Sequence, residues 1–197
     1  TASSENGKAD TTSRRVSAEV KIQLTDGIQL RSLTGYQYNR VNNAYDSDGA
    51  SVVTPLTRQA IAQPAFSQEF NLISTGNGPA QWVLGAYHYA FTSNKSGFLN
   101  NGAVDVQGHP GSKSQALFGQ LTYKVTDNVE LIGGIRYNKD ENSDNGNLTL
   151  LFIPAPHPVI PFNNVAKTDA WTGKLGANVR LNDDHNLYVT ASKGYRA

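Results

Sequence analysis

Apolar residues recur at every second position along most of this chain, and this spacing constrains its fold more than any other feature. In residues 170–181 the apolar side chains share one parity and the polar side chains share the other. In an extended strand the two parities point to opposite faces, so one face is apolar and the other is polar. A helix would instead place Lys174 and Asn178 among the apolar residues. The alternation therefore predicts a β-strand here.

The same alternation recurs along the chain and predicts an all-β fold of about eight strands. Several of them are 10 to 13 residues long, whereas strands of globular proteins are usually about 5 to 6 residues long. A strand that crosses a membrane at a tilt of about 45° needs about 9 to 11 residues. Strand length therefore favours a membrane-spanning sheet. The strands are predicted around residues 16–24, 28–38, 66–72, 81–92, 116–125, 129–138, 170–181 and 187–195.

The connections between the predicted strands alternate between short and long. Short turns rich in Gly, Asn and Asp are predicted at residues 25–27, 76–79, 126–128 and 182–185. Long loops are predicted at about residues 39–65, 93–113 and 139–167. In an antiparallel meander all short turns lie at one end of the sheet and all long loops at the other. Outer-membrane barrels have this asymmetry, with short periplasmic turns and long extracellular loops.

Composition excludes several classes of function. Lys and Arg number 17 and Asp and Glu number 16, so the formal charge is +1 and nucleic acid is not an expected partner. The absence of Cys excludes disulfides, zinc–thiolate sites and thiol nucleophiles. No run of about 18 apolar residues occurs, which excludes a transmembrane helix. There is no Met either, so we expect a processed protein or an excerpt of a longer one.

Four stretches of the sequence carry a family resemblance. They are LRSLTGY at 30–36, FSQEFNL at 66–72 with WVLGAY at 82–87, ALFGQLTY at 116–123 with GGIRY at 133–137, and NLYVTASKGYR at 186–196. In this order and at this spacing they resemble a TonB-dependent outer-membrane receptor. The resemblance covers nearly the whole chain from about Val16 onward.

The resemblance implies a place within a larger barrel. Receptors of this family close with about 22 strands around a plugged lumen, and about eight strands are predicted here. Residues 1–197 are therefore expected to be an internal part of the barrel, with the plug domain and the carboxy-terminal strand absent from this chain.

The resemblance also implies a function in the bacterial outer membrane. Such receptors import ferric siderophores or other scarce nutrients, and the expected partners are that ligand, outer-membrane lipid, and the TonB complex through the absent plug segment. The chain is not expected to be an enzyme or to hold a cofactor or metal, because no catalytic arrangement of residues stands out in the sequence. Two alternatives stay open, a passive porin-type barrel and a soluble β-sandwich binding module.

Two sets of side chains are candidates for the interior and for the ligand. At polar positions, charged residues are expected to line the lumen and to pair with neighbours, whereas Phe118 is an apolar exception to the alternation. The charged residues are Arg31, Glu69, Lys124, Glu130, Arg136, Lys174 and Arg180. Residues of the long loops are candidates to face the ligand, or else are ordinary exposed loop residues. They are Tyr45, Phe98, His109, Phe152, His157 and Phe162.

Overall fold

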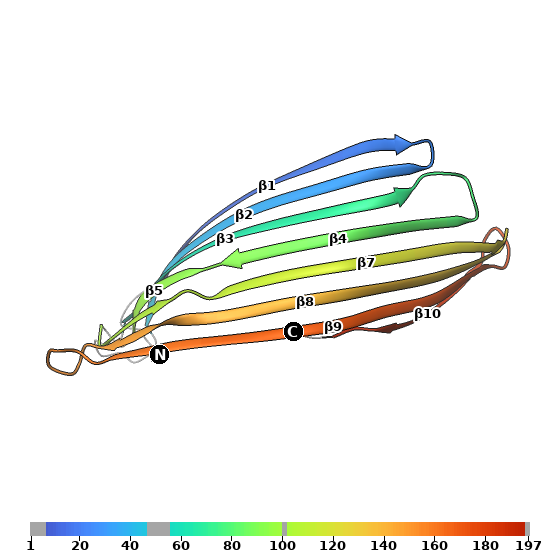
Figure 1. The fold of residues 1–197 in the computed structure, drawn as a ribbon. Coiled ribbons are helices and arrows are strands. Elements are labelled where there is room, and N and C mark those ends of the chain that lie inside the picture. The colour runs from blue at the N-terminus through green and yellow to red at the C-terminus, as the bar shows by residue number, and fades with distance from the viewer. Residues whose placement is uncertain (1–6, 47–55, 100–101, 196–197) are drawn as a thin grey trace.

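One curved antiparallel sheet contains all the regular structure of the computed structural model, which describes residues 7–46, 56–99 and 102–195 (Figure 1). Within these ranges no helix is long and apolar enough to cross a membrane. The strands are β1 (Lys8–Thr25), β2 (Ile28–Asp46), β3 (Leu56–Ser74), β4 (Ala80–Thr92), β5 (Asn94–Leu99), β6 (Val104–Gly108), β7 (Gly111–Thr126), β8 (Val129–Leu150), β9 (Val159–Arg180) and β10 (Asn186–Lys193).

β4 and β5 together form one long strand with a local break, and β6 and β7 together form another. Thr92 of β4 pairs with Gly111 of β7, and Lys95 of β5 pairs with Gly108 of β6, so the register is unchanged across the break. Pro110 has no N–H to contribute to the ladder, although its carbonyl still accepts a hydrogen bond from Ser93 N at 2.8 Å. The ten strands thus form a meander of eight long ones, which confirms the all-β meander predicted from the alternation.

The bounds of the long loops were wrong. β2 continues to Asp46, β8 continues to Leu150, and β5 and β6 lie within the predicted loop 93–113. Among the described residues of these connections, 102–103 and 151–158 remain outside strands, and residues 47–55 and 100–101 lie outside the described parts of the chain. Alternation cannot mark such strand extensions, because where both faces are polar the backbone ladder alone holds the strands together.

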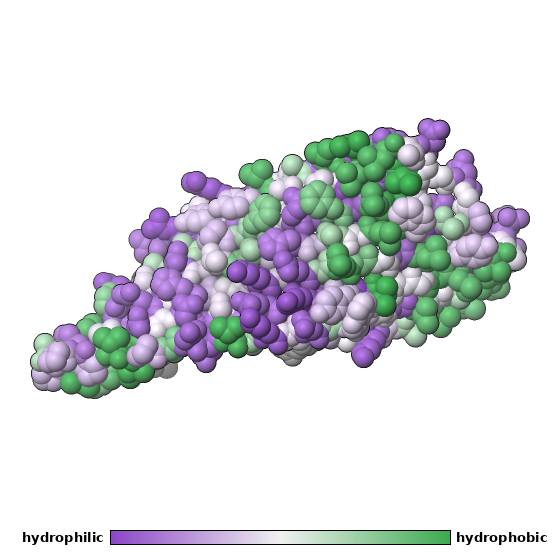
Figure 2. Space-filling model, in the orientation of Figure 1, coloured by the Kyte–Doolittle hydropathy of each residue, from purple (hydrophilic) through white to green (hydrophobic). Residues whose placement is uncertain are grey.

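The sheet has an apolar face and a polar face. Across the ladder Leu30 pairs with Leu72 and Leu72 with Leu84, so these side chains share the apolar face. Ile135 and Leu175, on the same face, are 57% and 72% exposed. Among the described residues Ala116 is the only buried hydrophobic one, so the sheet has no core of its own. Figure 2 shows apolar residues gathered over the half of the sheet that ends in the short turns. Lipid is the environment that such a face requires.

The polar face holds the charged residues predicted to line the lumen. Lys124 pairs with Glu130, Gly134 with Lys174, and the register places Arg31, Glu69, Arg136 and Arg180 on this same side. Their placement on one face is therefore confirmed. β1 and β10 form the two edges of the described sheet, and each pairs with a single neighbour.

Candidate functional site

A hollow on the polar face is centred where three small residues lie side by side on neighbouring strands. Ser17 of β1 pairs with Gly35 of β2, and Gly35 pairs with Ser67 of β3. A Cβ added to Gly35 would lie 2.7 Å from the Ser67 Oγ atom, which is closer than real Cβ contacts. The absence of a side chain at residue 35 thus leaves room that longer neighbours surround.

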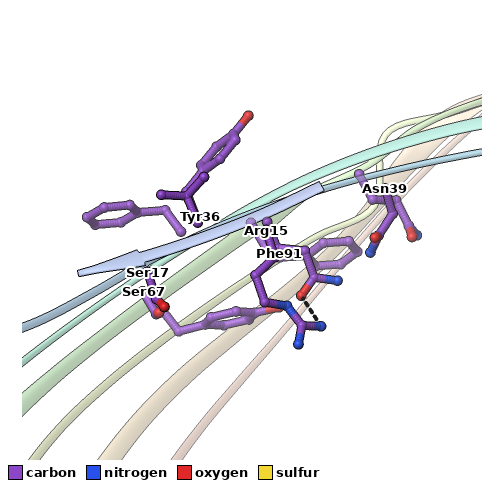
Figure 3. Close-up of a pocket in the computed structure, with 13 residues that line it drawn as sticks. Arg15, Ser17, Tyr36, Asn39, Ser67 and Phe91 are labelled. Atoms are coloured by element: carbon purple, nitrogen blue, oxygen red, sulfur yellow. Dashed lines mark hydrogen bonds between the residues drawn. The ribbon is translucent and has the colours of Figure 1, made fainter. Parts of the chain in front are cut away.

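The upper part of this hollow, toward the long-loop end, has a volume of about 370 Å³. Its walls include Arg15, Gln37 and the rings of Tyr89 and Phe91. Arg15 Nη2 donates a hydrogen bond to Gln37 Oε1 at 3.1 Å. Figure 3 shows Arg15 and Phe91 on the hollow side of the strands and Tyr36 on the opposite side. A guanidinium, amides and aromatic rings therefore face one space.

The lower part of the hollow has a volume of about 470 Å³ and shares Ser17, Gly35 and Ser67 with the upper part. Its charge is different, because Glu19 lies in its wall. Glu19 Oε1 lies 2.5 Å from Arg31 Nε and 3.5 Å from Lys21 Nζ. The carboxylate of Glu19 is therefore held by two cations, whereas Arg15 has only a neutral side-chain partner within the described residues.

A second polar cluster adjoins the lower part of the hollow, around Arg136 of β8. Its guanidinium lies 5.5 Å from the ring centroid of Tyr87 and 5.4 Å from that of Phe118. Arg136 Nε donates a hydrogen bond to Asn138 Oδ1 at 2.6 Å. Asn138 is only 3% exposed, and its Nδ2 has no partner among the described residues. The cluster leaves a hydrogen-bond donor unused at the polar face.

Tyr195, which follows β10, connects the end of the described chain to this cluster. Its hydroxyl donates a hydrogen bond to Asp140 Oδ2. Burial of the Tyr195 hydroxyl, together with its hydrogen bond to Asp140 and the charge of that carboxylate, raises its pKa to about 12. The tyrosine therefore stays protonated, and remains a donor to Asp140, throughout the physiological pH range.

The upper hollow suits a solute that combines negative charge with flat or aromatic groups. Arg15 offers several N–H donors, and Tyr89 and Phe91 offer ring surfaces. No group of three His, Asp or Glu residues that could hold a metal ion occurs in the described parts of the chain.

The six residues predicted to face the ligand do not come together. Tyr45 lies near the end of β2, and Phe98, in β5, has the parity of the apolar face. His109, between β6 and β7, has its Nδ1 2.9 Å from Asn94 Oδ1. The ring of Phe162 in β9 lies beside Gly146, and Phe152 and His157 lie in the β8–β9 loop. Contact between any of them and a ligand stays a prediction.

Sequence reasoning missed the residues that form the hollow. Arg15, Tyr89 and Phe91 stand at ordinary strand positions, and Gly35 is one of 18 glycines. Only the register, which aligns Ser17, Gly35 and Ser67 across three strands, shows where side chains are lacking. The sequence signal that could have indicated the hollow is that Ser17, Gly35 and Ser67, all small, occupy polar-face positions of neighbouring strands.

The whole chain, residues 1–197, matches the family described as TonB dependent receptor-like, beta-barrel. The chain belongs to this family. Barrels of the TonB-dependent receptor family lie in the bacterial outer membrane, and the apolar face of the sheet is the surface that meets its lipid. The family consists of receptors and transporters rather than enzymes.

A curated relative and several solved structures agree with this assignment. The pesticin receptor of Yersinia pestis is 28% identical over 91 residues, which are 45% of this chain and 12% of the receptor. The structure of the ferric yersiniabactin uptake receptor FyuA from Yersinia pestis has a TM-score of 0.75 at 17% identity, with 93% of this chain and 28% of FyuA covered. The ferric-catecholate import receptor Fiu from E. coli K12 has a TM-score of 0.73 at 13% identity, with 96% of this chain and 36% of Fiu covered.

These comparisons also show how much of each relative's length the chain covers. The 91 aligned residues are about an eighth of the pesticin receptor, and the chain covers 28% of FyuA and 36% of Fiu. At identities of 13% and 17% the structural likeness shows the fold, namely a continuous section of a TonB-dependent receptor barrel.

Proposed function

We propose that the protein that carries this chain is an outer-membrane receptor for a ferric siderophore or a similarly scarce nutrient, with uptake energised through TonB. In this proposal the chain contributes a section of the barrel wall. Its apolar face meets lipid, and its polar face, with the hollow around Gly35, lines the route of the ligand.

The observation that carries the proposal is the match of the entire chain to the receptor barrel family. The solved relatives add support, because FyuA takes up ferric yersiniabactin and Fiu imports ferric catecholate complexes. The hollow adds local chemistry. Ferric catecholates carry negative charge and flat rings, which match the guanidinium of Arg15 and the rings of Tyr89 and Phe91.

Growth under iron limitation tests the proposal. The gene is deleted from its host, and growth is measured with single purified ferric siderophores as the only iron source. We expect growth on at least one siderophore to be lost and then restored by the gene on a plasmid. In a host without TonB the plasmid should not restore growth.

The same experiment separates the proposal from the porin alternative. A passive porin would supply solute equally well with and without TonB, and deletion would affect many small solutes at once. Unchanged growth of the deletion strain on every siderophore and other scarce nutrient tested would overturn the proposed function.

A further inference from the structure

Three lysines stand on the apolar face, just beyond its apolar band at the long-loop end. Lys113 of β7 and Lys167 of β9 both pair with Glu141 of β8, so the three form one row across the sheet. Lys139 lies in the next row, where it pairs with Asp169. All three lysine side chains are exposed.

The edge of the apolar band lies directly below these lysines. Leu117 and Trp171 are 65% and 60% exposed, and both pair with Tyr137, whose ring centroid lies 4.9 Å from that of Trp171. Outer-membrane barrels place aromatic residues of this kind at the boundary between membrane and water. The row of Leu117, Tyr137 and Trp171 therefore marks the upper limit of the hydrocarbon on these strands.

Strand geometry places Lys139 at headgroup depth and the other two lysines just above it. Two residues along a strand span about 6.6 Å, which a tilt of about 40° reduces to about 5 Å of height. The Cα atom of Lys139 thus lies about 5 Å above that of Tyr137. The Cα atoms of Lys113 and Lys167 lie about 10 Å above those of Leu117 and Trp171. The headgroup layer is about 5 to 7 Å thick on each side of the hydrocarbon, and flexible lysine stems reach back toward it.

Charge is distributed unequally between the two ends of this part of the sheet. Of the three lysines only Lys167 forms an ion pair within the described chain, with Glu141 Oε2 at 3.1 Å. Three of the four short turns at the opposite end carry carboxylates and none carries Lys or Arg; the carboxylates are Asp26, Asp127, Asp183 and Asp184. Glu141 and Asp169 lie in the same rows as the three lysines, which leaves an excess of one positive charge there. An anionic group on the lipid side is therefore better accommodated at the long-loop end than at the turn end.

We propose that Lys113, Lys139 and Lys167 bind the phosphate groups of lipid headgroups in the outer leaflet. Lys113 and Lys167 lie about 10 Å apart across two strand spacings, and Lys139 lies about 8 Å from each. Ammonium groups at this spacing can reach the same phosphate or two adjacent ones. The site is on the face opposite the hollow, so it does not depend on the identity of the transported ligand.

Trp171 offers a local probe of this lipid. The receptor is reconstituted in phosphatidylcholine vesicles that contain either brominated phosphatidic acid or brominated phosphatidylcholine, both of which quench tryptophan on contact. The Trp171 signal is the difference between wild type and W171F. We expect phosphatidic acid to quench it preferentially, with the relative association constant falling about fivefold for each lysine replaced by glutamine.

The controls use the opposite face and the opposite end. K174Q changes a lysine of the same strand on the polar face and should leave the preference unchanged. Trp82, read through W82F, lies on the apolar face near the short turns and should show no preference for phosphatidic acid. Equal quenching of Trp171 by the two lipids in wild type, or an undiminished preference in folded K113Q/K139Q/K167Q, would overturn the proposal.

Discussion

The ring of Phe118 in β7 lies over Gly85, its cross-strand partner in β4. A Cβ added at residue 85 would overlap this ring and would lie 2.6 Å from Asn71 Oδ1. Phe118 is the apolar residue that breaks the alternation of its strand, and the missing side chain of Gly85 explains why the polar face accepts it. The ring also supports Arg136, whose guanidinium lies above it.

We therefore expect Gly85→Ala to lower the free energy of unfolding of the receptor by about 1 to 3 kcal/mol, the usual cost of overfilling a packed site. The measurement is urea unfolding of the receptor folded into lipid vesicles. Gly133→Ala is the matched control, because its added Cβ would meet only Leu175 Cδ2 at 3.7 Å. Equal losses at the two positions would contradict the role given to Phe118.

Arg136 supports a second prediction, because its guanidinium lies close to two rings while its Nε donates to Asn138. Lysine keeps the charge but lacks the flat guanidinium and its fixed donor. We expect Arg136→Lys to cost about 2 kcal/mol in the free energy of unfolding, from one charged hydrogen bond and weaker contacts with the rings. The same urea experiment measures it, with Arg180→Lys near the turn end as the control. A loss no larger than that of the control would show that the contacts are dispensable.

The alternation predicted the strands that cross the membrane because lipid and water impose opposite demands on the two faces. Residues 171–179 are an example, since Trp171, Leu175 and Val179 all lie on the apolar face of β9. Beyond Trp171 the constraint disappears, and β9 extends back to Val159 with polar and apolar residues mixed on both faces. The strand extensions were therefore read as loops.

The hollow could not be predicted for a different reason. It depends on Ser17, Gly35 and Ser67 being aligned across three strands, and a shift of one residue in either pairing would place them apart. The short turn at residues 25–27 sets the first pairing, but β2 and β3 are separated by residues 47–55, so the sequence does not reveal the second. The same limit applies to Arg136, whose position on the polar face was predicted but whose contacts with Tyr87 and Phe118 were not.

The assignment of the apolar face leads to a third prediction. Leu175 lies in the middle of the apolar band on β9, and Asn178 lies on the opposite face of the same strand. An arginine facing lipid near the bilayer midplane costs about 2 to 4 kcal/mol, whereas polar-face substitutions are tolerated. We expect Leu175→Arg to lower the free energy of unfolding in vesicles by this amount and Asn178→Arg to change it little. The opposite order would mean that the faces have been assigned the wrong way round.

Arg14 and Arg15 provide the most direct test of the hollow as a ligand site, because they are neighbours in β1 on opposite faces. Arg15 lines the upper hollow, whereas Arg14 pairs with Tyr38 on the apolar face. A charged hydrogen bond is worth about 1.5 to 3 kcal/mol, so loss of one such contact weakens binding of an anionic chelate at least about tenfold. We expect Arg15→Gln to raise the Kd for the transported ferric chelate by this factor and Arg14→Gln to leave it unchanged. Equilibrium binding of the radiolabelled chelate to cells that display equal amounts of receptor measures both. An unchanged Kd in Arg15→Gln would place the ligand elsewhere in the barrel, even if iron uptake by the receptor were established.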